Sequence, residues 1–337
     1  MNAAAHGRTF WIDVTKSVGI YLVVFSHAGM SGFAESFLWT FHVPLFFFVS
    51  GYLTREQSGR AFLGNVGRKL LLPYVLSYLL IALLSVALLP GADLGSLPRV
   101  LAGVAYGTHS YPYFVNAALW FLPSLITVEV LYVFCVRRFA PSYLLLLAVS
   151  YVLYRQHYLD LFMSIDLSLL GLNYFLAGLL ARRYELMRGI AAGGPRAALV
   201  AVAGALCTAA AASVGNLWYQ GEHYALSLGA GLAGILMVVS ASMLLAPWLG
   251  GQRAVRALLT FVSSNTLFIL CFHVFSNPLA SALLAPVALG PPLVRAVAVA
   301  ALSIALLVPF MLLARRFLPE LVGLRRGLPR RPADGRA

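Results

Sequence analysis

The sequence predicts an all-α membrane protein, a bundle of about ten transmembrane helices with both termini in the cytoplasm. Of its 337 residues, 61% are hydrophobic and only 10% are charged, and the mean hydropathy is +0.86. These values exclude an ordinary soluble domain and are typical of a polytopic membrane protein. We therefore expect one transmembrane domain over residues 1–318 and a short basic cytoplasmic tail over residues 319–337.

Apolar runs bounded by charges, Pro and Gly define the predicted helices. In chain order these cover residues 11–30, 37–54, 69–89, 117–136, 142–155, 166–182, 196–215, 224–247, 257–277 and 293–314. No small-residue cleavage site follows the first run, so we interpret it as a retained helix and not as a signal peptide.

The density of Lys and Arg alternates between successive loops. If the N-terminus is cytoplasmic, 20 of the 24 Lys and Arg residues lie on the inner side, three lie outside and Lys16 lies within the first helix. This asymmetry follows the positive-inside rule and supports an even number of helices. It also accounts for the net charge of +13 without nucleic acid, for which the chain has no binding motif.

The first helix carries Asp13, Lys16 and His27, although ionisable groups at membrane depth each cost about 2.5 to 3.5 kcal/mol. Lys16 and His27 are 11 residues apart. On a helix this spacing puts both side chains on one face, about 16 Å apart along the axis. Two functional groups therefore share a face at two depths.

The second helix contains the aromatic run FHVPLFFFVSGYL, with Ser50 and Gly51 as small residues for close packing. The seventh and eighth helices carry small residues including Gly231 and Gly234, and we assign them to the scaffold. Residues 90–121 are too apolar for a free loop and too broken by Pro and Gly for a clean span. We interpret them as a re-entrant or interfacial lid.

The predicted topology groups the polar residues at two levels. His27, His42 and His273 share an outer level, and Glu129 lies about halfway down its helix on an inward path from Trp120. The inner level holds Asp13, Lys16, Arg68 and Lys69. The result is a pore or cleft with a cationic inner mouth and an imidazole-lined outer end, which suits a long, doubly ended substrate.

Each of these residues also has a purely structural interpretation. Asp13 and Lys16 can neutralise one another at the interface, and Arg68 and Lys69 can be positive-inside anchors. The histidines can simply hydrogen-bond helices together. Three unpaired cysteines predict neither disulfides nor a metal site, and the motifs of soluble hydrolases, NTPases and metalloproteases are missing from the sequence.

Five motifs in order resemble the acyltransferase-3 family of integral membrane O-acyltransferases. Lys16 and His27 reproduce a basic-x10-His motif, and the others are FHVPLFFFVSGYL (41–53), RKLLLPY (68–74), LWFLPSL (119–125) and SSNTLFILCFH (263–273). The size of the chain and the aromatic run look closest to the branch that acetylates exopolysaccharides or lipid-linked sugars, including xanthan-type acetyltransferases. A fused soluble domain, found in another branch, is not expected after Arg315.

The resemblance implies a membrane O-acetyltransferase of the bacterial inner membrane that uses acetyl-CoA and a glycan or lipid-linked sugar. Asp13, Lys16, Arg68 and Lys69 would bind the donor, and His42, Trp120 and His273 would bind the substrate. His27 would be the general base, with Lys16 in the catalytic set and Glu129 orienting or balancing the imidazole. A transient acetyl-histidine is left open, and Trp120, Ser50 and Asn265 are candidate oxyanion donors.

Two other functions fit the same buried polar residues. A secondary transporter of a small polar solute would also place ionisable groups in its helices, although the sequence has no repeat relating its halves. A membrane sensing or exporting module of the kind that some family members carry beside a soluble enzyme is a third possibility. The identity of the sugar, the acyl group and the oligomeric state are left open by the sequence.

Overall fold

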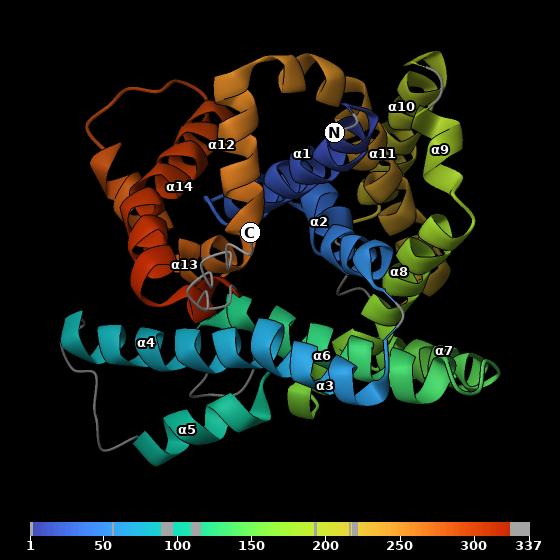
Figure 1. Cartoon of the computed structure of the whole chain (residues 1–337). Coiled ribbons are helices and arrows are strands. Elements are labelled where there is room, and N and C mark those ends of the chain that lie inside the picture. Colours follow the sequence, from blue (N-terminus) through green and yellow to red (C-terminus); the bar gives the residue numbers. More distant parts are fainter. Residues whose placement is uncertain are drawn as a thin grey trace, which may run out of the picture.

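The protein, described here by a computed structural model, folds into an all-helical bundle (Figure 1). The structure describes residues 3–55, 57–88, 97–108, 116–191, 194–215, 217 and 222–323. Its α-helices in chain order are α1 (Ala3–Ser26), α2 (Gly32–Leu53), α3 (Gly59–Val66), α4 (Leu72–Leu88), α5 (Leu97–Tyr106), α6 (Phe121–Leu131), α7 (Ser142–Arg155), α8 (Ile165–Arg183), α9 (Leu186–Ala191), α10 (Gly194–Ala212), α11 (Tyr224–Gly251), α12 (Arg253–Ser264), α13 (Thr266–Leu283) and α14 (Pro292–Phe317).

Shorter helical turns complete several of these elements. The π-helical turn η1 (Gly67–Leu71) joins α3 to α4, and a second π-helical turn, η4 (Tyr132–Val136), extends α6. The 3-10 turns are η3 (Ala117–Trp120), η5 (Phe162–Ser164) and η6 (Pro319–Val322). The runs that begin at Gly59 and at Ala118 are thereby continuous and long enough to cross a membrane.

Eight helical runs in the described part of the chain are long and apolar enough to span a membrane. They correspond to predicted helices two to four and six to ten. The first predicted helix is α1, which carries Arg8, Asp13 and Lys16, and the fifth is the 14-residue α7. The fold class is confirmed as a polytopic helical membrane protein, whereas ten spans and cytoplasmic termini remain predictions.

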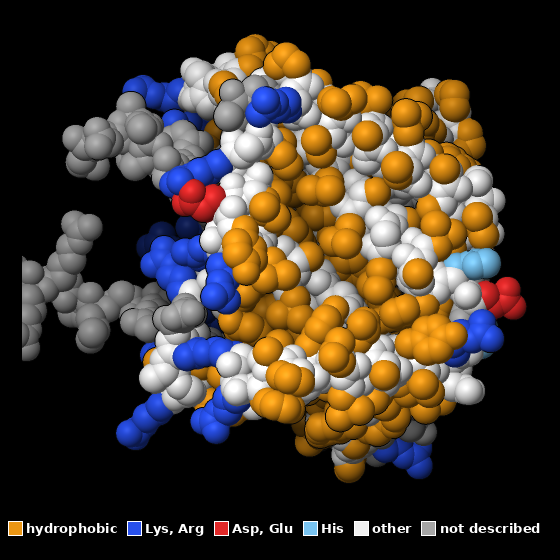
Figure 2. Space-filling view, turned by 90° about the vertical axis from the view of Figure 1, so that its right-hand side faces the viewer, with side chains coloured by type: hydrophobic (Ala, Val, Ile, Leu, Met, Phe, Trp, Pro, Cys, Tyr) orange, Lys and Arg blue, Asp and Glu red, His pale blue; other side chains and the backbone are white. Residues whose placement is uncertain are grey.

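The surface has the polarity that this fold requires. Figure 2 shows a face covered by hydrophobic side chains, with most Lys and Arg side chains at one edge and a smaller mixed group at the other. An apolar band between polar edges matches a protein that faces lipid around its middle.

The ninth predicted helix, 257–277, is wrong in its extent, because the structure divides that segment at Asn265. α12 ends at Ser264 and α13 begins at Thr266, while Asn265 has φ −115° and ψ 14°. The buried Asn265 side chain donates its own Nδ2–H to Phe261 O. Asn competes with helical hydrogen bonding in this way, and the apolar periodicity across the break concealed it.

α1 lies at the centre of the bundle and packs against α2, α11, α12, α13 and α14. Its connection to α2 is a short turn in which Gly29 has φ +84°, a conformation that glycine adopts without steric cost. This turn returns the chain directly, so that the outer end of α1 lies beside the first turns of α2.

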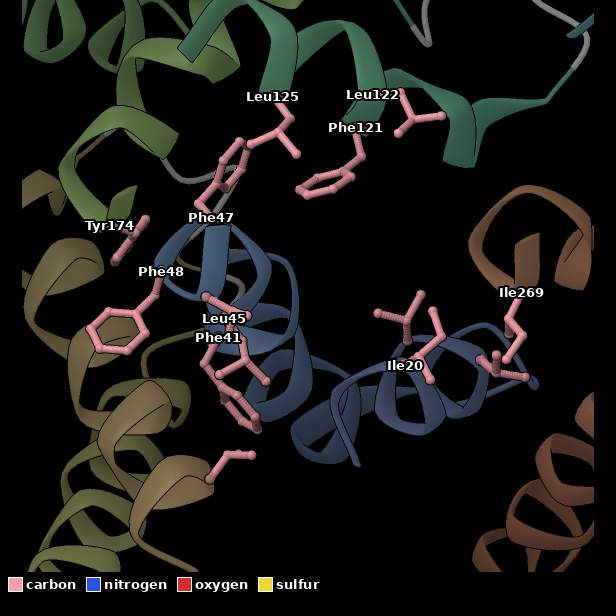
Figure 3. Close-up of a cluster of buried hydrophobic side chains, with 14 of the residues drawn as sticks. Ile20, Phe41, Leu45, Phe47, Phe48, Phe121, Leu122, Leu125, Tyr174 and Ile269 are labelled. Atoms are coloured by element: carbon pink, nitrogen blue, oxygen red, sulfur yellow. The ribbon is translucent and has the colours of Figure 1, made fainter. Parts of the chain in front are cut away.

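α2 approaches α8 closely enough that only glycine fits at the contact. A Cβ on Gly51 would overlap the Phe175 carbonyl oxygen, and a Cβ on Gly178 would overlap the Phe48 carbonyl oxygen. The aromatic side chains of α2 fill the space around this contact, as Figure 3 shows for Phe47 and Phe48. The predicted role of Gly51 in close packing is confirmed.

Small residues of α11 receive large side chains of α2 and α8. Gly234 lies against Phe41, and Gly231 lies against the Tyr174 ring, so that neither position has room for a Cβ. The assignment of these two glycines to the scaffold agrees with these contacts.

The predicted lid is described only in part. α5 lies within it, and Tyr74 of α4 donates a hydrogen bond to Val104 O in α5 at 2.8 Å. Residues 90–96 and 109–115 of the predicted lid, and residues 324–337 of the predicted tail, lie outside the described residues.

We expect Gly178→Ala to destabilise the protein by about 1 to 3 kcal/mol, the usual cost of overpacking a core. Its new methyl group would meet backbone atoms of α2 that cannot rotate away. Thermal unfolding in detergent measures the effect. Gly229→Ala is the matched control, because nothing lies within 4 Å of that position and Ala favours a helix over Gly. Equal melting temperatures for both variants would contradict this account of the contact.

Candidate functional site

Two cavities lie one above the other between α1, α2, α6 and α13. The inner cavity has a volume of ≈ 640 Å³ and contains Lys16, Lys69 and Glu129. The outer cavity has a volume of ≈ 140 Å³ and contains His27, His42 and Trp120. Each of the four helices, with η3 leading into α6, contributes side chains to both cavities. The helices therefore form a single passage with two chambers.

One face of α1 lines both chambers. Lys16 and Ile20 border the inner cavity, and Val23 and His27 border the outer cavity. These positions are spaced by four, three and four residues, which is the repeat of one helical face. Lys16 and His27 thus face the same passage at two depths, as their spacing predicts. Figure 3 shows Ile20 opposite Phe121 and Leu122 of α6.

Lys16 and Asp13 are both tied to the end of α12. The Lys16 ammonium donates to Ser263 O at 2.7 Å, and Ser263 Oγ donates to Asp13 Oδ1 at 2.7 Å. No direct ion pair joins Asp13 to Lys16 among the described residues. Ser263 instead connects them, and Asp13 is not among the residues that line the inner cavity. Asp13 positions the end of α12 and thereby supports Lys16.

The rest of the inner cavity comes from α6 and the segment after α2. Glu129 of α6 and Lys69 of η1 are near enough to interact electrostatically. Thr54, Arg55, Gln57 and Asn65 add further polar side chains. Arg55 and Lys69 are solvent-exposed, so the inner chamber opens to the outside of the protein at its cationic end.

π-helical turns occur on both walls of the inner chamber. Lys69 and Leu70 belong to η1, and Tyr132 begins η4 immediately after the α6 segment that carries Glu129. A π-helical turn changes the angular position of side chains relative to the regular helix, and such turns are frequent at functional sites. In this chain they occur where α3 leads into α4 and where α6 ends.

The three histidines of the outer level come together in the structure. The ring of His27 lies 5.0 Å from that of His273 and 6.5 Å from that of His42, measured between centroids. Trp39 packs beside both His27 and His42. His42 and His273 are buried, whereas His27 is exposed to the outer chamber. The grouping that the topology predicts is thus a cluster of rings in contact distance.

Each imidazole is held by the carbonyl oxygen of a residue three or four positions earlier in the chain. Nδ1 of His27 lies 2.9 Å from Val23 O, Nδ1 of His42 lies 2.7 Å from Leu38 O, and Nδ1 of His273 lies 2.9 Å from Leu270 O. A carbonyl oxygen only accepts, so in the neutral ring Nδ1 carries the hydrogen and Nε2 keeps the lone pair. Three basic Nε2 atoms result, and those of His42 and His273 have no hydrogen-bond partner in the described part of the chain.

Two predicted site residues lie apart from their expected partners. Arg68 donates its Nε–H to Gly64 O and does not line the inner cavity, because neighbouring residues on a helix point about 100° apart. Glu129 lines the inner chamber with Lys69, whereas His27 lines the outer one. No contact therefore supports a role for Glu129 in orienting the imidazole, and Glu129 lies in the chamber that also holds Lys16 and Lys69.

The candidate oxyanion donors are likewise separated. Trp120 lines the outer cavity with His27, and Ser50 lines the inner cavity. Asn265 is fully buried and lines neither of them. Only the Trp120 position is therefore suited to contact a group that reacts beside His27.

Sequence reasoning missed several residues that line the chambers or support their walls. Arg55, Gln57 and Asn65 line the inner chamber, Trp39 lines the outer chamber, and Ser263 connects Lys16 to Asp13. Trp39 lies three residues before His42 on the same helix, a spacing that could have identified it. The polar residues after α2 could have been included because they directly follow the end of that helix.

No group of three or more His, Cys, Asp or Glu side chains in the described residues has the arrangement of a metal site.

One known protein family matches most of the chain. Residues 9–313 match the family described as an acyltransferase domain, which is acyltransferase-3. No curated protein and no solved structure matches the chain. The matched segment contains every residue that lines the two chambers.

If the two chambers open on opposite sides of the membrane, single cysteines in them should be labelled from opposite sides. In a background lacking Cys135, Cys207 and Cys271, we expect Asn65→Cys to react with an impermeant maleimide in inverted vesicles and Val43→Cys to react in intact spheroplasts. Ile81→Cys, at a fully buried position, serves as the unlabelled control. Labelling of both chamber positions from one side would refute the arrangement.

Proposed function

Because the chain belongs to the acyltransferase-3 family and is a membrane acyltransferase, we propose that it transfers an acetyl group from cytoplasmic acetyl-CoA to a sugar hydroxyl. The acceptor is an exported polysaccharide or its lipid-linked precursor, and the membrane is the bacterial inner membrane. The observation that carries this proposal is that α1 presents a lysine to one chamber, while the residue directly after its last turn, His27, is an accessible histidine in the other.

The inner chamber supports the donor part of the proposal. The phosphates of CoA are anionic, and Lys16, Arg55 and Lys69 supply three cationic side chains around a cavity of ≈ 640 Å³. Lys and Arg are the usual partners of phosphate groups. Since Arg55 and Lys69 are exposed whereas Phe121 and Ile20 are buried, the nucleotide would stay at the inner mouth while the pantetheine arm points outward.

The outer chamber supports the chemical step. Nε2 of His27 takes the proton of the acceptor hydroxyl as its oxygen attacks the thioester carbonyl carbon. The C–O bond of the ester forms, the C–S bond breaks, and the CoA thiolate leaves and recovers a proton from the imidazolium. The hydrogen bond from Nδ1 to Val23 O keeps the basic nitrogen on the chamber side throughout.

The surroundings of His27 support a role in binding a sugar. Trp39 and Trp120 offer aromatic faces to a sugar ring, and the Nε2 atoms of His42 and His273 are unsatisfied hydrogen-bond acceptors. Buried acceptors are stabilised by a ligand that donates hydrogen bonds, and sugar hydroxyls are such donors. The apolar walls around them limit the access of water that would hydrolyse the thioester.

His27→Ala should lower acceptor-dependent CoA release by about 10²- to 10⁴-fold, the usual contribution of a general base. The assay uses purified protein in detergent with acetyl-CoA and lipid-linked oligosaccharide extracted from the producing cells, followed by mass spectrometry of the product. His223→Ala, an exposed position outside both chambers, should behave as wild type. Full activity in a folded His27→Ala protein would eliminate His27 as the base.

Lys69→Gln should raise the KM for acetyl-CoA by about tenfold, since a charge-assisted hydrogen bond is worth about 1.5 to 3 kcal/mol. The KM for S-acetyl-pantetheine, which lacks the phosphates, should change much less. Arg68→Gln is the neighbouring control and should change the KM for acetyl-CoA less, because Arg68 does not line the cavity. Equal effects of both variants would argue for a diffuse surface charge in place of a phosphate site.

A further inference from the structure

The inner and outer chambers are separated by a partition of three side chains. Phe46, Phe121 and Leu270 are the only described residues that line both cavities. They come from α2, α6 and α13, so each of the helices that face α1 across the passage contributes one of them. On α1 the partition falls between Ile20 on the inner side and Val23 on the outer side.

The partition is held in place from several directions. The rings of Phe46 and Phe121 meet edge to face, with centroids 6.2 Å apart and planes at 70°. Behind them, Phe121 packs on Phe47 with centroids 5.0 Å apart. On the α1 side, Gly19 leaves the space that Phe46 occupies, because a Cβ there would lie 3.2 Å from Phe46 Cζ.

A hydrogen bond also ties the α6 side of the partition to the α13 side. Asn116 Nδ2 donates to Cys271 O at 2.7 Å, and Asn116 Oδ1 accepts from Ala118 N at 2.9 Å. The first bond joins the start of η3 to the residue after Leu270, and the second fixes the turn that leads into Phe121. The relative positions of the three side chains are therefore set by the scaffold.

We infer that this partition, chiefly Phe46, selects the length of the acyl group and restricts the enzyme to the shortest acyl donors. The inference rests on the proposed acyltransfer between the two chambers. Acetyl-CoA is the donor class that the partition admits, and butyryl-CoA is the nearest class that it excludes.

The geometry of the reaction explains the selection. The CoA sulfur approaches from the inner chamber, and the hydroxyl approaches from the outer chamber, where His27 lies. Reacting atoms must come within about 3 to 3.5 Å, so the thioester carbonyl must lie at the partition itself. The acyl chain then projects sideways from that carbonyl into the ring edges of Phe46 and Phe121.

A methyl group is the smallest tail that a thioester can carry there. Each added methylene must displace a packed ring or occupy part of an outer chamber of only ≈ 140 Å³, which the acceptor also needs. Close-packed rings give way little. One methylene in a fitted pocket discriminates by about 10- to 200-fold, so two methylenes allow wide discrimination between acetyl and butyryl donors.

The test compares kcat/KM for acetyl-CoA and butyryl-CoA with the same acceptor. Wild type should strongly prefer acetyl-CoA. Phe46→Ala removes the ring nearest α1 and should raise the ratio of butyryl to acetyl kcat/KM by about tenfold or more, the value of one methylene of space. Phe46→Leu keeps the site apolar and filled, so it should raise this ratio less than Phe46→Ala does. If the alanine variant does not fold, the ratio measured for Phe46→Leu tests the inference.

Phe33→Ala is the matched control, because Phe33 lies on the same helix, is exposed and lines neither chamber. It should leave the ratio at the wild-type value. An unchanged ratio in the folded Phe46 variants, or an equal change in Phe33→Ala, would overturn the partition as the selecting element. If wild type transfers no acyl group from any acyl-CoA, the proposed function fails instead, so the two failures are distinguishable.

Discussion

An ionisable side chain among apolar helices is stable only when the protein supplies partners that water would otherwise provide. α1 meets this constraint by taking its partners from main-chain carbonyls. Lys16 uses the carbonyl of Ser263, and His27, directly after the end of α1, uses that of Val23 four residues earlier. The central place of α1 in the bundle follows, because α12 must reach Lys16 while α2 and α13 must bring their histidines to His27.

Much of this arrangement was predictable because it depends on periodicity and charge. Eight of the ten predicted ranges overlap helices long and apolar enough to span, and the shared face of Lys16 and His27 follows from helix geometry alone. The break at Asn265 was not predictable from apolar periodicity, because the residues on both sides continue the pattern. Side-chain hydrogen bonding decides such a break, here the bond from Asn265 Nδ2 to the carbonyl of Phe261 four residues earlier.

Prediction of the site from the sequence is limited in the same way. The depth of a residue follows from the sequence, but its direction around the helix depends on packing and on local π-helical turns. Arg68 and Lys69 were both expected in the site because they lie at the same depth. Their side chains point in different directions around the helix, so only Lys69 lines the cavity. Glu129 likewise has the right depth to lie between the two levels, yet it faces the cations of the inner chamber.

Each histidine ring is hydrogen-bonded to a carbonyl three or four residues earlier in the chain. This arrangement separates the position of the proton on each ring from the distances between the rings. The position of the proton on each ring is set within one helix, whereas the distances between the rings are set by three helices and the turn at Gly29. A small shift of one helix against another would therefore change the distances between the three rings, while the lone pair of each ring would stay on Nε2. Lateral pressure from a surrounding bilayer, which shifts helices against one another, would therefore act on the distances between the rings and not on the position of the proton.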